Sequence, residues 1–256
     1  MKNLHLLFFS ILLSSGLFAQ TSKEIENNLE NAFMKIDYWG EHRSDKIEYS
    51  DSLSDANKVF CEMLYHYSTK YPFTIYQKFN KLEGKFDILT SEDNRFRIYS
   101  WDSRTGGTMH FFNNIFQYKR GNKTFAIVDT PKGDGNISLL FRKIYIFKNG
   151  AKRYYLCAYR FIESTKYYGE GVKVFAIKKG TLDNKAKIFK ANSALTNDLS
   201  YEYDSSSLVD IKVKPEIYFN AATNTINLPL ITSNGKVTSS YIAYKFTGQY
   251  FERVKN

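Results

Sequence analysis

The feature that most constrains the fold is a change of pattern near Phe73. From there onward, aromatic and β-branched residues alternate with Lys, Thr and Ser in short runs, as in half-buried strands. Clear examples are "KFDILTS", "FRIYSW", "KTFAIVD", "RYYLCAYRF", "GVKVFAI", "TINLPLI" and "SSYIAYKF". Turn sequences such as "EDN", "RGN", "KNGA" and "SNGK" separate the runs. Because no helix-length pattern intervenes, the sequence disfavours parallel βαβ units and predicts antiparallel hairpins.

Two helical patterns precede this β-rich part. The first, "SKEIENNLENAFMKIDYW", has apolar residues at helical spacing. The second, "SLSDANKVFCEMLYHYSTKYP", is expected to start at a capping Ser52 or Ser54 and to end before Pro72. The polar segment between them, "GEHRSDKIEYSD", predicts a loop. We therefore expect a helical segment over residues 20–72, packed on an antiparallel β domain over residues 73–256.

A weak internal repeat bears on the form of the sheet. The segments "FQYKRG", "YIFKNG" and "FAIKKG" end at Gly121, Gly150 and Gly180, and "YKFTG" is a shorter copy ending at Gly248. Such spacing suits propeller blades or a meander. Similar hairpin chemistry, with Gly at a left-handed turn position, explains the pattern equally simply and is favoured. The expected fold class is mainly β (α+β), with a propeller-like or meandering sheet and a β-sandwich as the alternative.

The first nineteen residues predict an export signal. Lys2 supplies the positive end, an apolar run follows, and Ala19 is a suitable residue before a cleavage site. The apolar run is short for a membrane span, and no later segment approaches the length of a membrane helix. We therefore expect a periplasmic or secreted protein without a transmembrane segment.

The charge of the chain bears on its partners. The formal net charge is +10, and loss of Lys2 with the signal would leave +9. Outside the cytosol such a charge points to anionic glycans, lipid headgroups or an acidic partner rather than to nucleic acid. Scattered lysines that solvate exposed strands are the simpler interpretation, because the chain has no polybasic run.

The two cysteines, Cys61 and Cys157, leave their redox state open. An oxidising compartment permits a disulfide between them. Each lies in an apolar run, however, which suits a buried free thiol equally well. Neither has a neighbouring catalytic signature.

The segment "SWDSRTGGTMHFFNN", residues 100–114, is the strongest candidate for a site. Trp with Asp, Arg and His is a common combination in pockets for sugars or small anions. A bend at Gly106–Gly107, made by positive φ or close backbone approach, would bring the side chains together around a Trp platform. The alternative is a tight corner in which Asp102 caps the turn and pairs with Arg104. The candidate ligand-binding residues are Trp101, Asp102, Arg104, Thr105, Thr108 and His110.

Catalytic and metal signatures are missing from the sequence. Only His42, His66 and His110 follow the export signal, and none belongs to an HxH or HExxH pattern. No G-x-S-x-G elbow or P-loop occurs. A carboxylate pair for glycoside hydrolysis would have to come from Asp93, Asp102, Glu163, Glu170 or Asp204. We therefore predict no catalytic residue, metal or cofactor.

The segments "SEDNRFRIYSWD" and "GGTMHFF", with a leader ending "FAQ", resemble a family of secreted proteins from Bacteroides-type Gram-negative bacteria. That family has no assigned activity, so the resemblance implies export and assigns no functional residue. The sequence as a whole predicts an exported, non-catalytic protein that binds a glycan or another envelope protein. A glycan hydrolase using acids near Asp102 and a structural envelope component are the alternatives. The ligand, the oligomeric state and the sheet topology are left open.

The export signal gives the first testable prediction. N-terminal sequencing of the protein isolated from its natural host should begin near Gln20, because cleavage after Ala19 removes the signal. A purified chain that still begins at Met1 would contradict export by this route.

Overall fold

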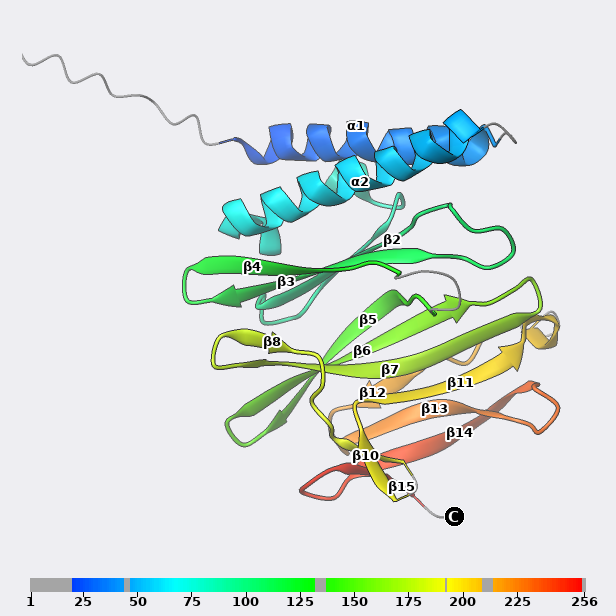
Figure 1. The fold of residues 1–256 in the computed structure, drawn as a ribbon. Coiled ribbons are helices and arrows are strands. Elements are labelled where there is room, and N and C mark those ends of the chain that lie inside the picture. Colours follow the sequence, from blue (N-terminus) through cyan, green and yellow to red (C-terminus); the bar gives the residue numbers. More distant parts are fainter. Residues whose placement is uncertain (1–19, 44–46, 132–136, 192, 209–213, 255–256) are drawn as a thin grey trace, which may run out of the picture.

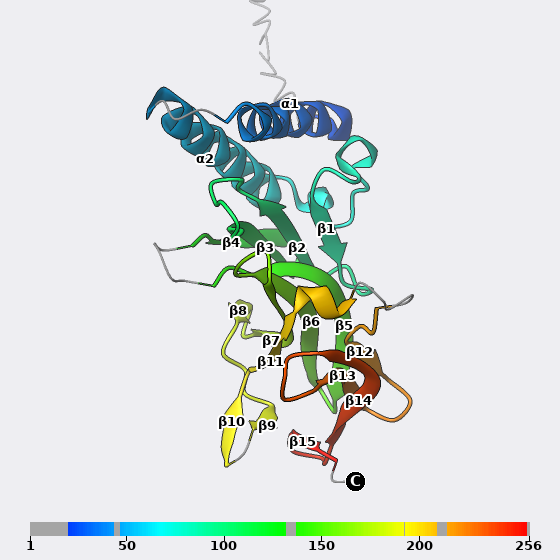
Figure 2. The ribbon, with the colours of Figure 1, turned by 90° about the vertical axis from the view of Figure 1, so that its right-hand side faces the viewer.

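The chain folds into four stacked layers: one layer of two helices and three sheets whose strands are mainly antiparallel (Figures 1 and 2). The structure is a computed structural model and describes residues 20–43, 47–131, 137–191, 193–208 and 214–254. The predicted export signal, residues 1–19, lies outside the described residues. No helix in these ranges is long and apolar enough to span a bilayer.

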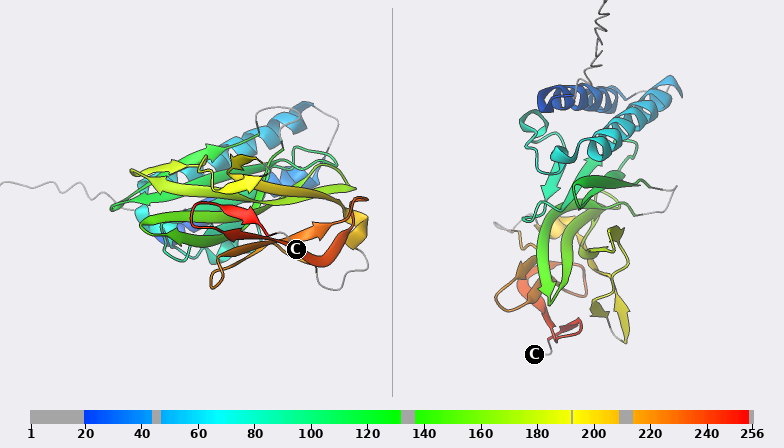
Figure 3. Two further views of the ribbon diagram at one scale, coloured as in Figure 1. Left: turned by 90° about the horizontal axis from the view of Figure 1, so that it is seen from below. Right: turned by 90° about the vertical axis from the view of Figure 1, so that its left-hand side faces the viewer.

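The helical layer consists of α1 (Ser22–Glu41) and α2 (Ile47–Lys70). The α1 helix begins with a capping box, in which Thr21 and Glu24 each bond the other's backbone amide. Its buried face contains the apolar stripe expected from the sequence, Ile25, Leu29, Phe33 and Ile36, together with Ala32. Figure 3 shows both helices at one end of the molecule, over the first sheet.

The first sheet has the order β1-β2-β3-β4. Its strands are β1 (Asp87–Thr90), β2 (Phe96–Asp102), β3 (Phe112–Arg120) and β4 (Lys123–Asp129). Two 3-10 turns, Pro72–Ile75 and Asn80–Leu82, connect it to α2. Alternate residues of β2 face opposite layers: Tyr99 and Trp101 pack with the helices, and Phe96 and Ile98 pack against the middle sheet.

The middle sheet has the order β11-β7-β6-β5, with β8 beside β7. Its strands are β5 (Leu140–Asn149), β6 (Lys152–Ile162), β7 (Tyr167–Lys178), β8 (Thr181–Asp183) and β11 (Asp198–Asp204). Aromatic rings fill the space between it and the first sheet. The Phe116 and Phe175 ring centroids are 4.9 Å apart, and those of Phe116 and Phe141 are 5.4 Å apart.

The third sheet has the order β10-β9-β15-β14-β13-β12 and covers the other face of the middle sheet. Its strands are β9 (Phe189–Ala191), β10 (Ala194–Thr196), β12 (Tyr218–Asn220), β13 (Thr225–Ile231), β14 (Val237–Phe246) and β15 (Phe251–Arg253). A 3-10 turn, Ser205–Leu208, follows β11. Every described pairing is antiparallel except that of β15 with β9. Phe251 is fully buried between the two sheets.

The glycines of the sequence repeat all lie at hairpin turns. Gly121, Gly150, Gly180 and Gly248 connect β3 to β4, β5 to β6, β7 to β8 and β14 to β15. Their φ angles are 58°, 57°, 77° and 102°, in the region that glycine enters without steric cost. Positive φ at each turn is what the hairpin interpretation of the pattern requires.

The predicted fold class is confirmed. Two helices are followed by antiparallel strands in meandering sheets, and strands outnumber helices. The expected start of the second helix was wrong, because α2 begins at Ile47 rather than near Ser52 or Ser54. The extra turn packs Tyr49 against Trp39 of α1, with ring centroids 6.4 Å apart, which favours helix over loop there.

Both cysteines are free thiols in different layers. Cys61 lies on α2 and packs against the core between the helices and the first sheet. Cys157 lies on β6 and is buried between the first and middle sheets. Burial, together with the nearby Glu62 carboxylate, raises the pKa of the Cys61 thiol from 9.0 to about 11. Burial also raises the pKa of Cys157 well above its usual value.

These pKa shifts predict slow alkylation. Below pH 9, Cys61 should carry about 100-fold less thiolate than a thiol with a pKa of 9.0, and its reaction rate should rise about tenfold per pH unit up to pH 11. Peptide mass spectrometry after timed iodoacetamide exposure measures this rate. Cys157 is the internal control, since it should react only after unfolding. A Cys61 rate that is flat between pH 8 and pH 10 would contradict the raised pKa.

Candidate functional site

The segment at residues 100–114 joins β2 to β3, and the structure buries its tryptophan. Trp101 is 1% exposed, and its ring packs edge-on against Phe60 of α2 at 5.1 Å. Its Nε1 donates to Oδ1 of Asn57 at 3.1 Å. The alternation of β2 turns this side chain toward the helices, so Trp101 is a core residue and offers no platform to a ligand.

Asp102 caps the turn that follows β2. Its Oδ1 accepts from the backbone amide of Arg104 at 2.8 Å, and its Oδ2 lies 2.6 Å from Nδ1 of His110. Arg104 adopts a φ of 58°, which is rare for a residue with a side chain. Its guanidinium pairs with Asp37 of α1 at 2.6 Å rather than with Asp102, which corrects the pairing expected for a corner.

Further contacts attach this corner, residues 102–110, to neighbouring elements. Nη2 of Arg43 donates to the carbonyls of Arg104 and Gly106 at 3.1 and 2.7 Å. The backbone amide of His110 donates to the Ile162 carbonyl of β6 at 3.1 Å. The corner therefore joins the helices to the first and middle sheets.

The two glycines of the corner have different roles. The bend was expected to arise from positive φ or from close backbone approach. Neither Gly106 nor Gly107 has positive φ, so the first of these is wrong. A Cβ at Gly106 would lie 1.9 Å from the Met109 carbonyl oxygen, so close backbone approach requires glycine there. Gly107 has open space around it.

A groove lies beside the corner, between α2 and the strands β3 and β4. It consists of two adjoining hollows of about 440 and 270 Å³ that share Asn57, Asn113 and Thr130. We call it the α2 groove. Its larger hollow is lined by Asn57, Lys58, Cys61, Glu62, Tyr65, Asn113, Val128 and Thr130. Its smaller hollow is lined by Ser54, Asn57, Ser103, Thr105, Phe111, Asn113, Thr130 and Pro131.

The floor of the α2 groove is held rigidly by Asn57. Its Nδ2 donates to the carbonyls of Leu53 and Ser103, both at 2.9 Å, while its Oδ1 accepts from Trp101. The walls of the larger hollow include Tyr65 and Val128, which are 42% and 41% exposed and are therefore accessible to a ligand. The groove thus combines a fixed polar floor with exposed aromatic and aliphatic faces.

Of the six residues that the sequence singled out, Thr105 lines the α2 groove. Its Oγ1 lies 2.7 Å from Oγ of Ser103. Asp102, Arg104 and His110 form the adjoining corner, Thr108 is exposed on it, and Trp101 lies beneath the groove. The groove residues of α2 were missed because their helical spacing indicates only packing against the sheet.

The acidic residues considered for hydrolysis contact different partners. Asp93 bonds Arg153 and Tyr155, and Asp204 bonds Lys166. Glu170 is buried in a cluster with Arg160, Lys214, Tyr201 and Tyr203. Within the described ranges, no group of three or more side chains suited to hold a metal occurs. No protein-family model, curated protein or solved structure matches this chain.

The contacts of Asp102 predict a structural role for it. Asp102→Ala removes the acceptor for the Arg104 amide and for His110, and should lower the free energy of unfolding by about 1 kcal/mol. Urea denaturation measures this change. Thr108→Ala, an exposed change in the same loop, is the control and should be near neutral. Equal stability of the two variants would contradict the capping role.

Proposed function

We propose that the protein is an exported, non-catalytic binding protein that holds a glycan in the α2 groove. The observation that carries this proposal is the joining of a hydroxyl- and amide-lined hollow to an exposed tyrosine face. Sugar hydroxyls exchange hydrogen bonds with such groups, and the apolar faces of sugar rings pack on aromatic side chains. The larger hollow has the volume of an ordinary ligand pocket.

The charges of the groove favour a neutral saccharide. Its lining contains one cation and one carboxylate, Lys58 and Glu62. A glycoside hydrolase requires two carboxylates that flank the scissile bond. Glu62 is the single carboxylate among the described lining residues, which supports binding without hydrolysis.

Removal of the aromatic face tests the proposal. A glycan array, followed by calorimetry with the best-bound saccharide, identifies the ligand of the purified protein. Tyr65→Ala should then weaken binding about tenfold, because stacking on an aromatic ring contributes about 1.4 kcal/mol. Stability should change little, since the ring is 42% exposed.

Tyr76→Ala is the matched control, since Tyr76 is 55% exposed and lies outside the α2 groove. The bound saccharide should also slow alkylation of Cys61, which lines the larger hollow. Full affinity of the Tyr65→Ala protein, together with an unprotected Cys61, would place the ligand elsewhere.

A further inference from the structure

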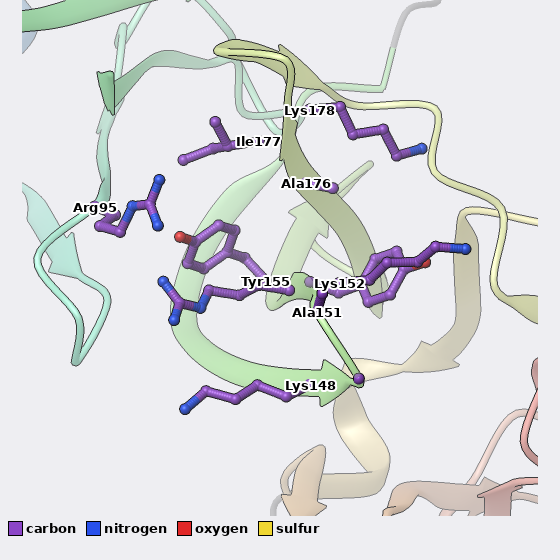
Figure 4. Close-up of a pocket in the computed structure, with 11 residues that line it drawn as sticks. Arg95, Lys148, Ala151, Lys152, Tyr155, Ala176, Ile177 and Lys178 are labelled. Atoms are coloured by element: carbon purple, nitrogen blue, oxygen red, sulfur yellow. The ribbon is translucent and has the colours of Figure 1, made fainter. Parts of the chain in front are cut away.

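A second pocket, which shares no lining residue with the α2 groove, is rich in cations (Figure 4). It has a volume of about 490 Å³ and lies where the turn between β1 and β2 meets the strands β5, β6 and β7. We call it the cationic pocket. Its charged lining residues are Arg95, Lys148, Lys152, Arg153 and Lys178.

Three of the cations come together from two layers. Lys148 and Arg153 are directly paired across β5 and β6, so their side chains share the face toward the first sheet. Arg95 comes from the turn before β2. Figure 4 shows Arg95 and Lys148 on the same side of the β6 strand, with the ring of Tyr155 near Arg95. Lys152 and Lys178 lie on the opposite face of the middle sheet, because they share the face of Tyr154 and Ala176, and Figure 4 shows them pointing away from Arg95.

Asp93 fixes this arrangement. Its Oδ1 accepts from Oγ of Ser91 at 2.6 Å and from the Arg95 amide at 3.2 Å, which pins the turn. Its Oδ2 accepts from Nη1 of Arg153 at 2.8 Å and from the Tyr155 hydroxyl at 3.1 Å. Both carboxylate oxygens are therefore used in holding the turn and the arginine in place.

The pocket keeps an excess of positive charge. Asp93 pairs with Arg153, and Asp183 pairs with Lys178 at 2.6 Å. In the part of the chain that the structure describes, Arg95, Lys148 and Lys152 form no salt bridge. Moreover, Nε of Arg153 is buried and has no hydrogen-bond partner there, which is costly for a guanidinium donor. An oxyanion in the pocket would supply acceptors for the side chains of Arg95 and Lys148.

We propose that the cationic pocket binds a saccharide that carries sulfate or phosphate esters. Arginine and lysine side chains bind such oxyanions through charge-assisted hydrogen bonds. Three cations that gather on one side of the pocket, Arg95, Lys148 and Arg153, fit a ligand with more than one anionic group better than a single inorganic ion. The residues involved differ from those of the α2 groove, so this proposal does not depend on the proposed function.

Calorimetry with a multiply sulfated oligosaccharide and its desulfated counterpart tests the proposal. The purified protein should bind the sulfated form at least tenfold more tightly, and affinity should fall as salt is added. The double variant Arg95→Ala/Lys148→Ala should lose at least tenfold in affinity. The matched control Lys236→Ala/Lys245→Ala removes two exposed lysines outside the pocket and should change affinity less than twofold. Equal losses in both variants would show that net charge alone attracts the probe, and would overturn the proposal.

Two further measurements separate the alternatives. Tyr65→Ala should bind the sulfated probe as the wild type does, so a failure of the α2 groove proposal would not affect this one. The protein is also tested with vesicles of acidic phospholipid as the probe. Vesicle binding that the Arg95→Ala/Lys148→Ala change abolishes, with no binding of the saccharide, would assign the pocket to a membrane surface. That result would overturn the saccharide assignment. Equal affinity for the sulfated and desulfated probes would overturn it as well.

Discussion

The structure depends on burial of both faces of its first and middle sheets. A sheet that lies between two other layers has no solvated face, so consecutive residues of its central strands must pack in opposite directions. In β2 the six residues from Phe96 to Trp101 are all buried. The same holds for residues 154–159 of β6. The many Tyr and Phe side chains fill the space on both faces of these sheets. Smaller apolar side chains would leave voids there.

Two-sided burial also places polar residues inside, where each needs a partner. Gln117 of β3 donates from Nε2 to the Ser68 carbonyl and to Oγ1 of Thr74, both at 2.8 Å. At the face between the middle and third sheets, Glu170 is 7% exposed and contacts Arg160 and Lys214. Burial lowers the pKa of Lys214, while the Glu170 carboxylate opposes that shift. Such bonds tie the layers together where hydrophobic packing alone is incomplete.

Local patterns predicted the elements, and contacts between distant residues decided the site. The helical stripe of α1, the alternation of the strands and the hairpin glycines are local properties, and the structure contains them. The burial of Trp101 depends on Asn57, and the orientation of Arg104 depends on Asp37. Neither pairing leaves a signal in the sequence. The cationic pocket escaped notice for the same reason, because Arg95 meets the β5–β6 hairpin only through the stacking of sheets.

The strand β2 positions both proposed sites. The turn that carries Arg95 precedes its first residue, and Ser103 and Thr105 of the α2 groove follow its last. Seven residues of strand separate the two ends by about 20 Å. This exceeds the screening length of about 8 Å at physiological salt, so charge in the cationic pocket has little effect at the groove. The strand between the two sites is buried on both faces from Phe96 to Trp101, so packing in the core fixes its position. Under the two proposals, affinity is therefore set separately at the two sites, by stacking in the α2 groove and by charge in the cationic pocket.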